Sequence, residues 1–197
     1  MLFDIFRLFS GIVGIPRSKS EETMRPEALE RVKLVFTLFD VDGNGNLEQN
    51  DFDLMTGRVL AIATESSGAA RNALADSFSN WWTVLRTELD ANHDNKISFE
   101  EFTACVLSPE RFDDAIARFA NALAALGDPD GDGLIPRPLF MDLMIAIGFD
   151  RPNINALFDA FQPNSDDQVA VPVWVEAIKE YYQPEAAGTA GDKLVTA

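Results

Sequence analysis

Apolar residues recur at helical spacing in several stretches of the chain, and polar loops separate these stretches. Four loops begin at Asp40, Asp90, Asp128 and Gln162, and an amphipathic pattern lies on both sides of each. An apolar residue every three to four positions predicts a helix with one buried face. The helix–loop–helix unit repeats with loop starts 50, 38 and 34 residues apart. The pattern predicts an all-α fold in which two pairs of such units pack into a compact, two-lobed molecule.

Proline positions and composition divide the chain into segments. Pro26 suits the first turn of a helix, where its missing N–H group would have no partner in any case. Ser108 precedes a proline and therefore favours extended backbone, which ends the helix before it. The expected segments are an N-terminal extension (1–23), a first pair of units (24–109), a second pair (110–183) and a tail (184–197). The tail has little apolar content, so we expect it to be flexible.

The N-terminal extension is unusually apolar over residues 2–15. It is too short to span a bilayer, and Asp4 and Arg7 interrupt the apolar run that a secretory signal would need. Residues 1–23 carry no net charge and so offer no attraction to anionic lipid. We therefore expect an amphipathic helix that docks on the protein itself, with a membrane surface or a partner protein as alternatives.

The first loop, residues 40–51, carries oxygen donors at the positions where a calcium-binding loop needs them. Ca²⁺ takes about six to eight oxygen ligands, which such a loop supplies from positions 1, 3, 5, 7, 9 and 12. The expected ligands are Asp40, Asp42, Asn44, Asn46 (through its backbone carbonyl) and Asp51. Glu48 at position 9 adds an oxygen directly or through a water molecule. Gly45 at position 6 permits the sharp turn around the ion.

Position 12 of this loop departs from the usual pattern. Asp51 stands where a bidentate Glu is common, and its side chain is one methylene shorter. It therefore reaches an ion with both oxygens less readily, which favours six ligands over seven. Because Mg²⁺ demands six ligands in octahedral geometry, we expect site one to accept Mg²⁺ as well as Ca²⁺.

The second loop, residues 90–101, is also nearly complete. Its expected ligands are Asp90, Asn92, Asp94, Lys96 (through its backbone carbonyl) and Glu101. Ser98 at position 9 is expected to act through a water molecule. Asn95 replaces the glycine of position 6, which is tolerable because Asn adopts the left-handed conformation more readily than most residues. The sequence therefore predicts a second functional site.

The third loop begins as a calcium loop and ends without a ligand. Its first half carries Asp128, Asp130 and Asp132. Prolines stiffen the second half, and Leu139 at position 12 offers no oxygen. The missing group normally supplies two ligand atoms, so we expect weak binding or none.

The fourth loop, residues 162–173, lacks carboxylates at its first and last positions and is expected to be a structural pseudo-site. An apolar residue stands at position 8 of every loop, in chain order Leu47, Ile97, Ile135 and Val169. We expect these residues to pair two by two as short β-bridges. Such pairing would give the defective loops a structural reason to persist.

These loops resemble those of the four-EF-hand sarcoplasmic calcium-binding protein family, and particularly its prokaryotic calerythrin-like members. The resemblance rests on the sequence DVDGNGNLEQNDF with Asp at position 12, on the long spacer before loop two and on the aromatic-rich helices. It covers about residues 24–183. It implies a compact, near-globular molecule that acts as a calcium buffer or transporter, while Leu139 and Val173 at position 12 argue against three or four bound ions.

The charge of the chain is concentrated in the loops. The chain has 32 acidic and 16 basic residues and a net charge of −16. The four loops hold 13 of the acids against Lys96 and Arg137, which places −11 of the charge within them. Such a surplus repels nucleic acid and anionic lipid, so neither is expected as a partner. An apolar content of 47% with 15 Phe excludes disorder, and a single Cys excludes a disulfide framework; a cytoplasmic monomer is expected.

The expected function is binding of Ca²⁺ as an intracellular buffer, with one ion in each of the first two loops. The alternative is a sensor that exposes a hydrophobic groove to a target helix when Ca²⁺ binds. The five scattered Met residues favour the buffer, because promiscuous sensors use Met-rich grooves. A carrier of an apolar ligand rests only on the aromatic residues. An enzyme is least favoured, because the sequence has a single His and no nucleophile–base pair or phosphate-binding loop.

Overall fold

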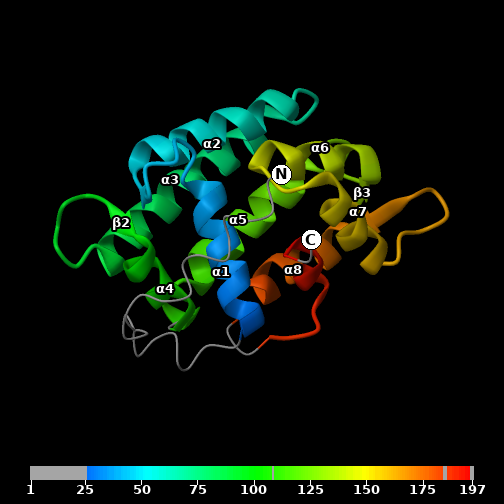
Figure 1. Cartoon of the computed structure of the whole chain (residues 1–197). Coiled ribbons are helices and arrows are strands. Elements are labelled where there is room, and N and C mark those ends of the chain that lie inside the picture. The colour runs from blue at the N-terminus through cyan, green and yellow to red at the C-terminus, as the bar shows by residue number, and fades with distance from the viewer. Residues whose placement is uncertain (1–25, 108, 184–185, 196–197) are drawn as a thin grey trace, which may run out of the picture.

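Helix–loop–helix units follow one another along the chain in the computed structural model, which describes residues 26–107, 109–183 and 186–195 (Figure 1). The first two units comprise α1 (Pro26–Phe39), β1 (Asn46–Leu47), α2 (Gln49–Ile62), α3 (Gly68–Leu89), β2 (Ile97–Ser98) and α4 (Phe99–Leu107). The last two, after the 3₁₀ turn η1 (Pro109–Arg111), comprise α5 (Asp113–Leu126), β3 (Leu134–Pro136), α6 (Arg137–Ile147), α7 (Arg151–Ala160), β4 (Gln168–Ala170) and α8 (Val171–Tyr181). A second 3₁₀ turn, η2 (Ala190–Leu194), lies near the C-terminus. The predicted all-α fold of two EF-hand pairs in a two-lobed molecule is confirmed.

The helices begin and end where the sequence supplies suitable residues. Ser67 caps α3 by accepting a hydrogen bond from the backbone N–H of Ala70 at 3.2 Å. Prolines lie in the first turns of α6, α7 and α8, where a missing N–H group costs nothing. Gly148 ends α6 at φ +114°, a backbone conformation that residues with a Cβ rarely adopt. Local chemistry therefore fixes the lengths of the helices that carry the loops.

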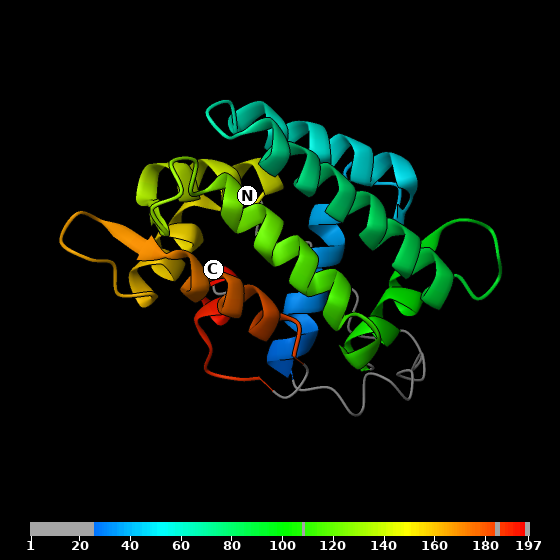
Figure 2. The same ribbon diagram turned by 180° about the vertical axis from the view of Figure 1, so that it is seen from behind.

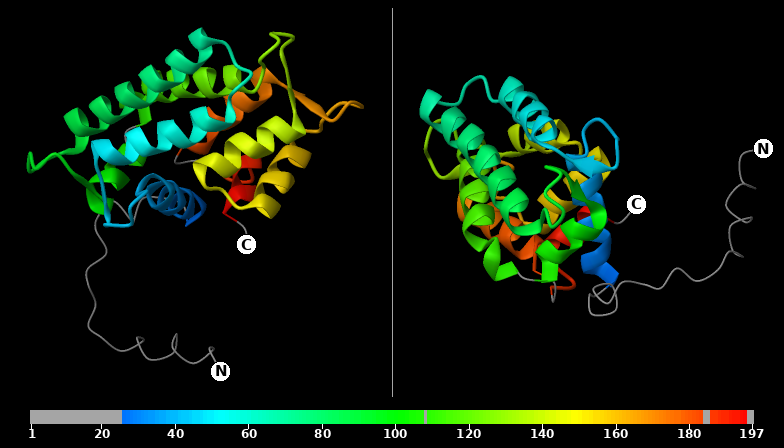
Figure 3. Two further views of the ribbon diagram at one scale, coloured as in Figure 1. Left: turned by 90° about the horizontal axis from the view of Figure 1, so that it is seen from above. Right: turned by 90° about the vertical axis from the view of Figure 1, so that its left-hand side faces the viewer.

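The position-8 residues of the loops join the units in pairs. β1 pairs with β2 in antiparallel register, with Leu47 opposite Ile97. β3 pairs with β4 in the same way, with Ile135 opposite Val169. Each of these four side chains is at most 3% exposed. The predicted β-bridges are confirmed, and they lie at opposite ends of the molecule (Figures 1 and 3).

The two lobes share one hydrophobic core. α5 lies between α3 and α8, as Figure 2 shows, and α2 packs against α6. Trp81 of α3, only 1% exposed, contacts Phe39 of its own lobe as well as Phe119 and Tyr182 of the other. Such aromatic pairs add stability beyond the area that they bury. The apolar faces of one lobe are therefore covered by those of the other.

The C-terminal segment, for which composition predicts a flexible tail, contacts α1 through Arg31. Arg31 of α1 is 1% exposed, and its guanidinium donates to the backbone carbonyls of Tyr181, Gln183 and Ala186 at 2.9–3.0 Å. It also pairs with Asp192 in η2 at 2.6 Å. Leu194 is 6% exposed. One buried cation thus fastens a segment whose few apolar residues gave no sign of docking, while the flexibility expected of residues 184–197 stays a prediction. The N-terminal extension, 1–23, lies outside the described residues.

No helix in the described ranges is both long and apolar enough to cross a bilayer.

Replacing Arg31 by Met should lower the free energy of unfolding by about 3 kcal/mol, because a buried, hydrogen-bonded ion pair loses one partner. Urea denaturation measures the change. Arg58→Met, at an exposed position of α2, is the matched control and should shift stability by less than about 0.5 kcal/mol. Equal effects of the two substitutions would show that Arg31 does not hold the C-terminal segment.

Candidate metal centre

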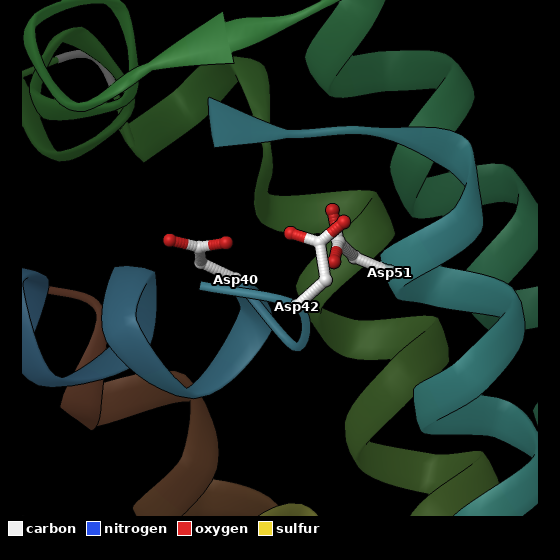
Figure 4. A group of neighbouring side chains, drawn as sticks. All are labelled: Asp40, Asp42 and Asp51. Atoms are coloured by element: carbon white, nitrogen blue, oxygen red, sulfur yellow. The ribbon is translucent and has the colours of Figure 1, made fainter. Parts of the chain in front are cut away.

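Loop one folds around its own acidic side chains. Asp40 accepts hydrogen bonds from the backbone N–H groups of Asn44 at 3.0 Å and Gly45 at 2.8 Å. Asp42 accepts from the N–H of Asn44 at 3.1 Å. These bonds turn the chain so that carboxylate oxygens of Asp40, Asp42 and Asp51 lie within 4.8 Å of one another (Figure 4). Three of the five ligands that the sequence predicts for site one are thereby brought together.

Asp51 closes loop one from the start of α2. Its two carboxylate oxygens accept from the N–H groups of Val41 at 3.0 Å and Glu48 at 2.8 Å, positions 2 and 9 of the loop. Asp51 is 1% exposed. Burial raises the pKa of this carboxyl above the usual value; the two N–H groups oppose that rise, and the nearby charge of Asp42 adds to it. The shorter position-12 side chain therefore still links both ends of the loop.

Loop two repeats this arrangement position by position. Asp90 accepts from the N–H groups of Asp94 at 3.1 Å and Asn95 at 3.0 Å. Glu101 at position 12 accepts from the N–H groups of Ala91 at 3.1 Å and Ser98 at 2.9 Å, again positions 2 and 9. In both loops, the position-12 acid thus accepts from the backbone N–H groups of positions 2 and 9, an arrangement that we call the clasp.

The carboxylates of loop two are less tightly gathered than those of loop one. Among the described residues, the groups of three acids with oxygens within 4.8 Å lie in loops one and three. In loop two, Asp94 accepts from the side-chain amide of Asn92 at 3.0 Å and from the N–H of Lys96 at 2.9 Å. Asn92 and Lys96 are thereby placed in the loop beside Asp94, but the three acids predicted as ligands (Asp90, Asp94 and Glu101) are spread more widely.

Position 6 is left-handed in all four loops. Its residues in chain order are Gly45, Asn95, Gly133 and Asp167, with φ between +60° and +83°. Gly adopts this conformation freely, and Asn and Asp are the residues that follow it most closely. The loops that lack ligands therefore keep the same tight turn as the loops that have them.

Loop three gathers carboxylates but lacks a closing acid. Oxygens of Asp128, Asp130 and Asp132 lie within 4.8 Å of one another. Oδ1 of Asp128 is buried, and no described residue donates a hydrogen bond to it. At position 12, the half-buried Leu139 packs against the hydrophobic core. Half of a cation site is present, and the clasp that loops one and two share is missing.

Loop four is tied to loop three by Arg137, a residue that sequence analysis did not single out. The guanidinium donates to Asp167 at 2.8 Å and to Asp159 at 2.7 Å, and it lies 4.3 Å from the centre of the Phe158 ring. The hydrogen bond from Arg137 lowers the pKa of the Asp167 carboxyl. In the second lobe, the guanidinium of Arg137 thus pairs with a carboxylate of loop four, that of Asp167.

The register of the strands could have revealed this contact. Ile135 lies opposite Val169, and continuing that antiparallel register by two residues places Arg137 opposite Asp167. The same reasoning in the first lobe places Lys96 opposite Glu48, and their charged groups lie 2.6 Å apart. The sequence predicted Lys96 only as a backbone ligand, so the reach of its side chain into the neighbouring loop was missed.

Comparison with known proteins supports the interpretation of the loops as those of EF-hands. No family model matches the chain. Calerythrin from Saccharopolyspora erythraea is 23% identical over 163 residues, 79% of this chain and 92% of that protein. The sarcoplasmic calcium-binding protein beta chain from Penaeus sp. is 31% identical over 117 residues, 53% of this chain and 59% of that protein. A calcium-binding protein from Streptomyces coelicolor superposes with a TM-score of 0.66 at 26% identity, covering 81% of this chain and 99% of that structure.

These similarities support the resemblance of the chain to sarcoplasmic calcium-binding proteins, and to calerythrin among them. The resemblance that the loop sequences suggested is confirmed. Members of this family are calcium-binding EF-hand proteins, and the acidic groups of the loops suit Ca²⁺.

Replacing Arg137 by Met should lower the melting temperature of the calcium-free protein by about 2–4 °C, because loops three and four lose their cation bridge. The pKa of Asp167 is lowered in the folded protein, so the pairing stabilises above about pH 4 and is lost as the pH falls through that lowered pKa. Thermal melts in chelator should therefore separate the variant from the wild type at pH 7, and the difference should shrink only as the pH falls below about 4 and through the lowered pKa of Asp167. Arg151→Met, at an exposed position of α7, should have no such effect.

Proposed function

We propose that the protein is a Ca²⁺ buffer that binds one ion in each of loops one and two. The observation that carries this proposal is the shared clasp, in which Asp51 and Glu101 bridge positions 2 and 9 of their loops. The proposed ligands of site one are Asp40, Asp42, Asn44, Asn46 and Asp51. Those of site two are Asp90, Asn92, Asp94, Lys96 through its carbonyl, and Glu101. An ionised carboxylate has about four lone-pair sites, so the clasping oxygens keep capacity for an ion.

The buffer is favoured over a sensor by the way the lobes cover each other. A sensor needs an apolar groove that opens when Ca²⁺ binds. Here Met55 and Val59 of α2 and Met144 of α6 are at most 4% exposed, and α2 packs against α6. Opening one lobe would therefore have to separate it from the other. The cost of that separation opposes a groove that opens freely to a target helix.

Site one is the proposed Mg²⁺-competent site. Mg²⁺ requires octahedral geometry and keeps several of its waters, whereas Ca²⁺ accepts larger and less regular ligand sets. Asp51 accepts the same two backbone N–H bonds as Glu101, but its side chain is one methylene shorter. This supports a smaller ligand set at site one than at site two, where Glu101 has the longer side chain.

The second lobe serves as the structural partner of the first. Loop three lacks a position-12 acid, and loop four has Gln162 and Val173 at its first and last positions, so neither offers a complete ligand set. β3 and β4 nevertheless hold the two loops together, and α5 completes the core against α3.

A carrier of an apolar ligand is not favoured. An apolar cavity of about 60 Å³ lies between the lobes, and Phe119, Met144, Trp174 and Leu194 are among its lining residues. Pockets for organic ligands measure about 300–1,000 Å³. The aromatic residues around this space thus act as a packed core.

Replacing Glu101 by Gln should reduce the number of tightly bound Ca²⁺ ions from two to one, because the closing ligand of site two loses its charge. Isothermal titration calorimetry measures the stoichiometry. Glu100→Gln makes the same chemical change one residue away, at an exposed position, and should leave two ions bound. Tight binding of two ions by Glu101→Gln would refute the assignment of site two.

Calcium titration with a hydrophobic dye separates the buffer from the sensor. We expect two bound ions, no calcium-dependent rise in dye fluorescence, and weakening by millimolar Mg²⁺ at one of the two sites. A calcium-dependent dye signal would favour the sensor. A site one that ignores Mg²⁺ would contradict the proposed role of Asp51.

A further inference from the structure

Lys96 belongs to loop two by sequence, but its side chain lies against loop one. Asn46 and Leu47 pair with Ser98 and Ile97, so the next step of the same register brings Glu48 opposite Lys96. The Lys96 ammonium and the Glu48 carboxylate are 2.6 Å apart. Because Leu47 and Ile97 are fully buried beside them, the backbone that carries this ion pair is fixed.

Glu48 is the side chain through which site one can enlarge its ligand set. It stands at position 9, from which a calcium loop reaches the ion directly or through a water molecule. Its backbone N–H donates to Asp51 at 2.8 Å, which places it beside the closing acid of the site. A cation that holds the Glu48 carboxylate therefore withholds an oxygen from site one.

We propose that Lys96 sets the affinity and ion selectivity of site one by competing with the bound ion for Glu48. This inference rests on the proposed function, in which site one binds a cation. It assigns the two ends of Lys96 to different sites: the backbone carbonyl serves site two, and the ammonium restrains site one.

The competition discriminates between ions. Ca²⁺ accepts up to about eight oxygens and gains from a further carboxylate, whereas Mg²⁺ keeps much of its water shell. Withholding the Glu48 carboxylate from site one therefore lowers its affinity for Ca²⁺ more than its affinity for Mg²⁺. Together with the short Asp51, Lys96 makes site one less selective for Ca²⁺ than its acidic composition suggests.

The second lobe contains the same cross-loop pairing in a different form. Arg137 lies opposite Asp167, and its planar guanidinium binds two carboxylates at once. Asp167 occupies position 6, which supplies no ligand, so this bridge does not compete for a ligand position. The Lys96 bridge differs because its carboxylate partner stands at a ligand position.

The test measures ion binding at site one alone, in a Glu101→Gln background that removes site two. Lys96→Met should raise the Ca²⁺ affinity of site one by about two- to fivefold, the range expected for an exposed ion pair, and should raise the Mg²⁺ affinity less. Lys96→Arg, which keeps the cation, should retain the original affinity. Lys33→Met is the matched control, because Lys33 is also 47% exposed and paired with a Glu, but lies on α1 outside the loops.

A double-mutant cycle with Glu48→Gln isolates the competition from the general loss of positive charge. In the Glu48→Gln protein, Lys96→Met should change the affinity no more than Lys33→Met does. An undiminished effect of Lys96→Met in that protein, or equal effects of Lys96→Met and Lys33→Met in the parent, would overturn the inference while leaving site one intact. Absence of Ca²⁺ binding at site one in every variant would overturn the proposed function and this inference with it.

Discussion

The antiparallel pairing of loops at position 8 is the constraint on which the rest of the structure depends. Leu47 with Ile97, and Ile135 with Val169, form buried bridges that fix each loop against its neighbour. No loop can be lost without leaving its partner's strand unpaired and an apolar side chain exposed. This explains why loops three and four retain the left-handed turn at position 6 although their ligand sets are incomplete. It also sets which charged side chains face each other across the loops.

The two lobes differ in how they balance concentrated negative charge. Loop one gathers three carboxylates, and mutual repulsion favours a cation there. In the second lobe, Arg137 supplies a permanent positive charge to Asp159 and Asp167. A guanidinium is charged at every accessible pH and is covalently part of the chain. The occupancy of an ion site, in contrast, depends on the free concentration of the ion. Loop four thus keeps its positive partner at any ion concentration, whereas loop one has no such fixed cation among its three gathered carboxylates; loop three gathers three carboxylates as loop one does, but lacks the position-12 acid.

The fold and the loop backbone follow from local sequence, whereas the long-range contacts do not. Helical periodicity predicted the paired units, and the apolar residue at position 8 predicted the bridges. Neither indicates that Arg31 is buried beneath the C-terminal segment, because its partners are mostly backbone carbonyls of residues about 150 positions away. The Lys96–Glu48 and Arg137–Asp167 pairs are intermediate between contacts that local sequence predicts and contacts that it does not. Each follows from the strand register once the pairing is assumed, so charge patterns become informative only after the fold is known.

Arg31 connects α1 to the C-terminal segment that follows α8. It lies in α1, and its partners lie at the last residue of α8 and beyond it, so the contact joins the two ends of nearly the whole described chain. Between these ends, α3 runs against α5 and α2 against α6, across the line between the two EF-hand pairs. Cutting the chain between those pairs would leave each half without the contacts that cover its apolar faces. The halves are thus units of sequence repetition rather than of independent folding.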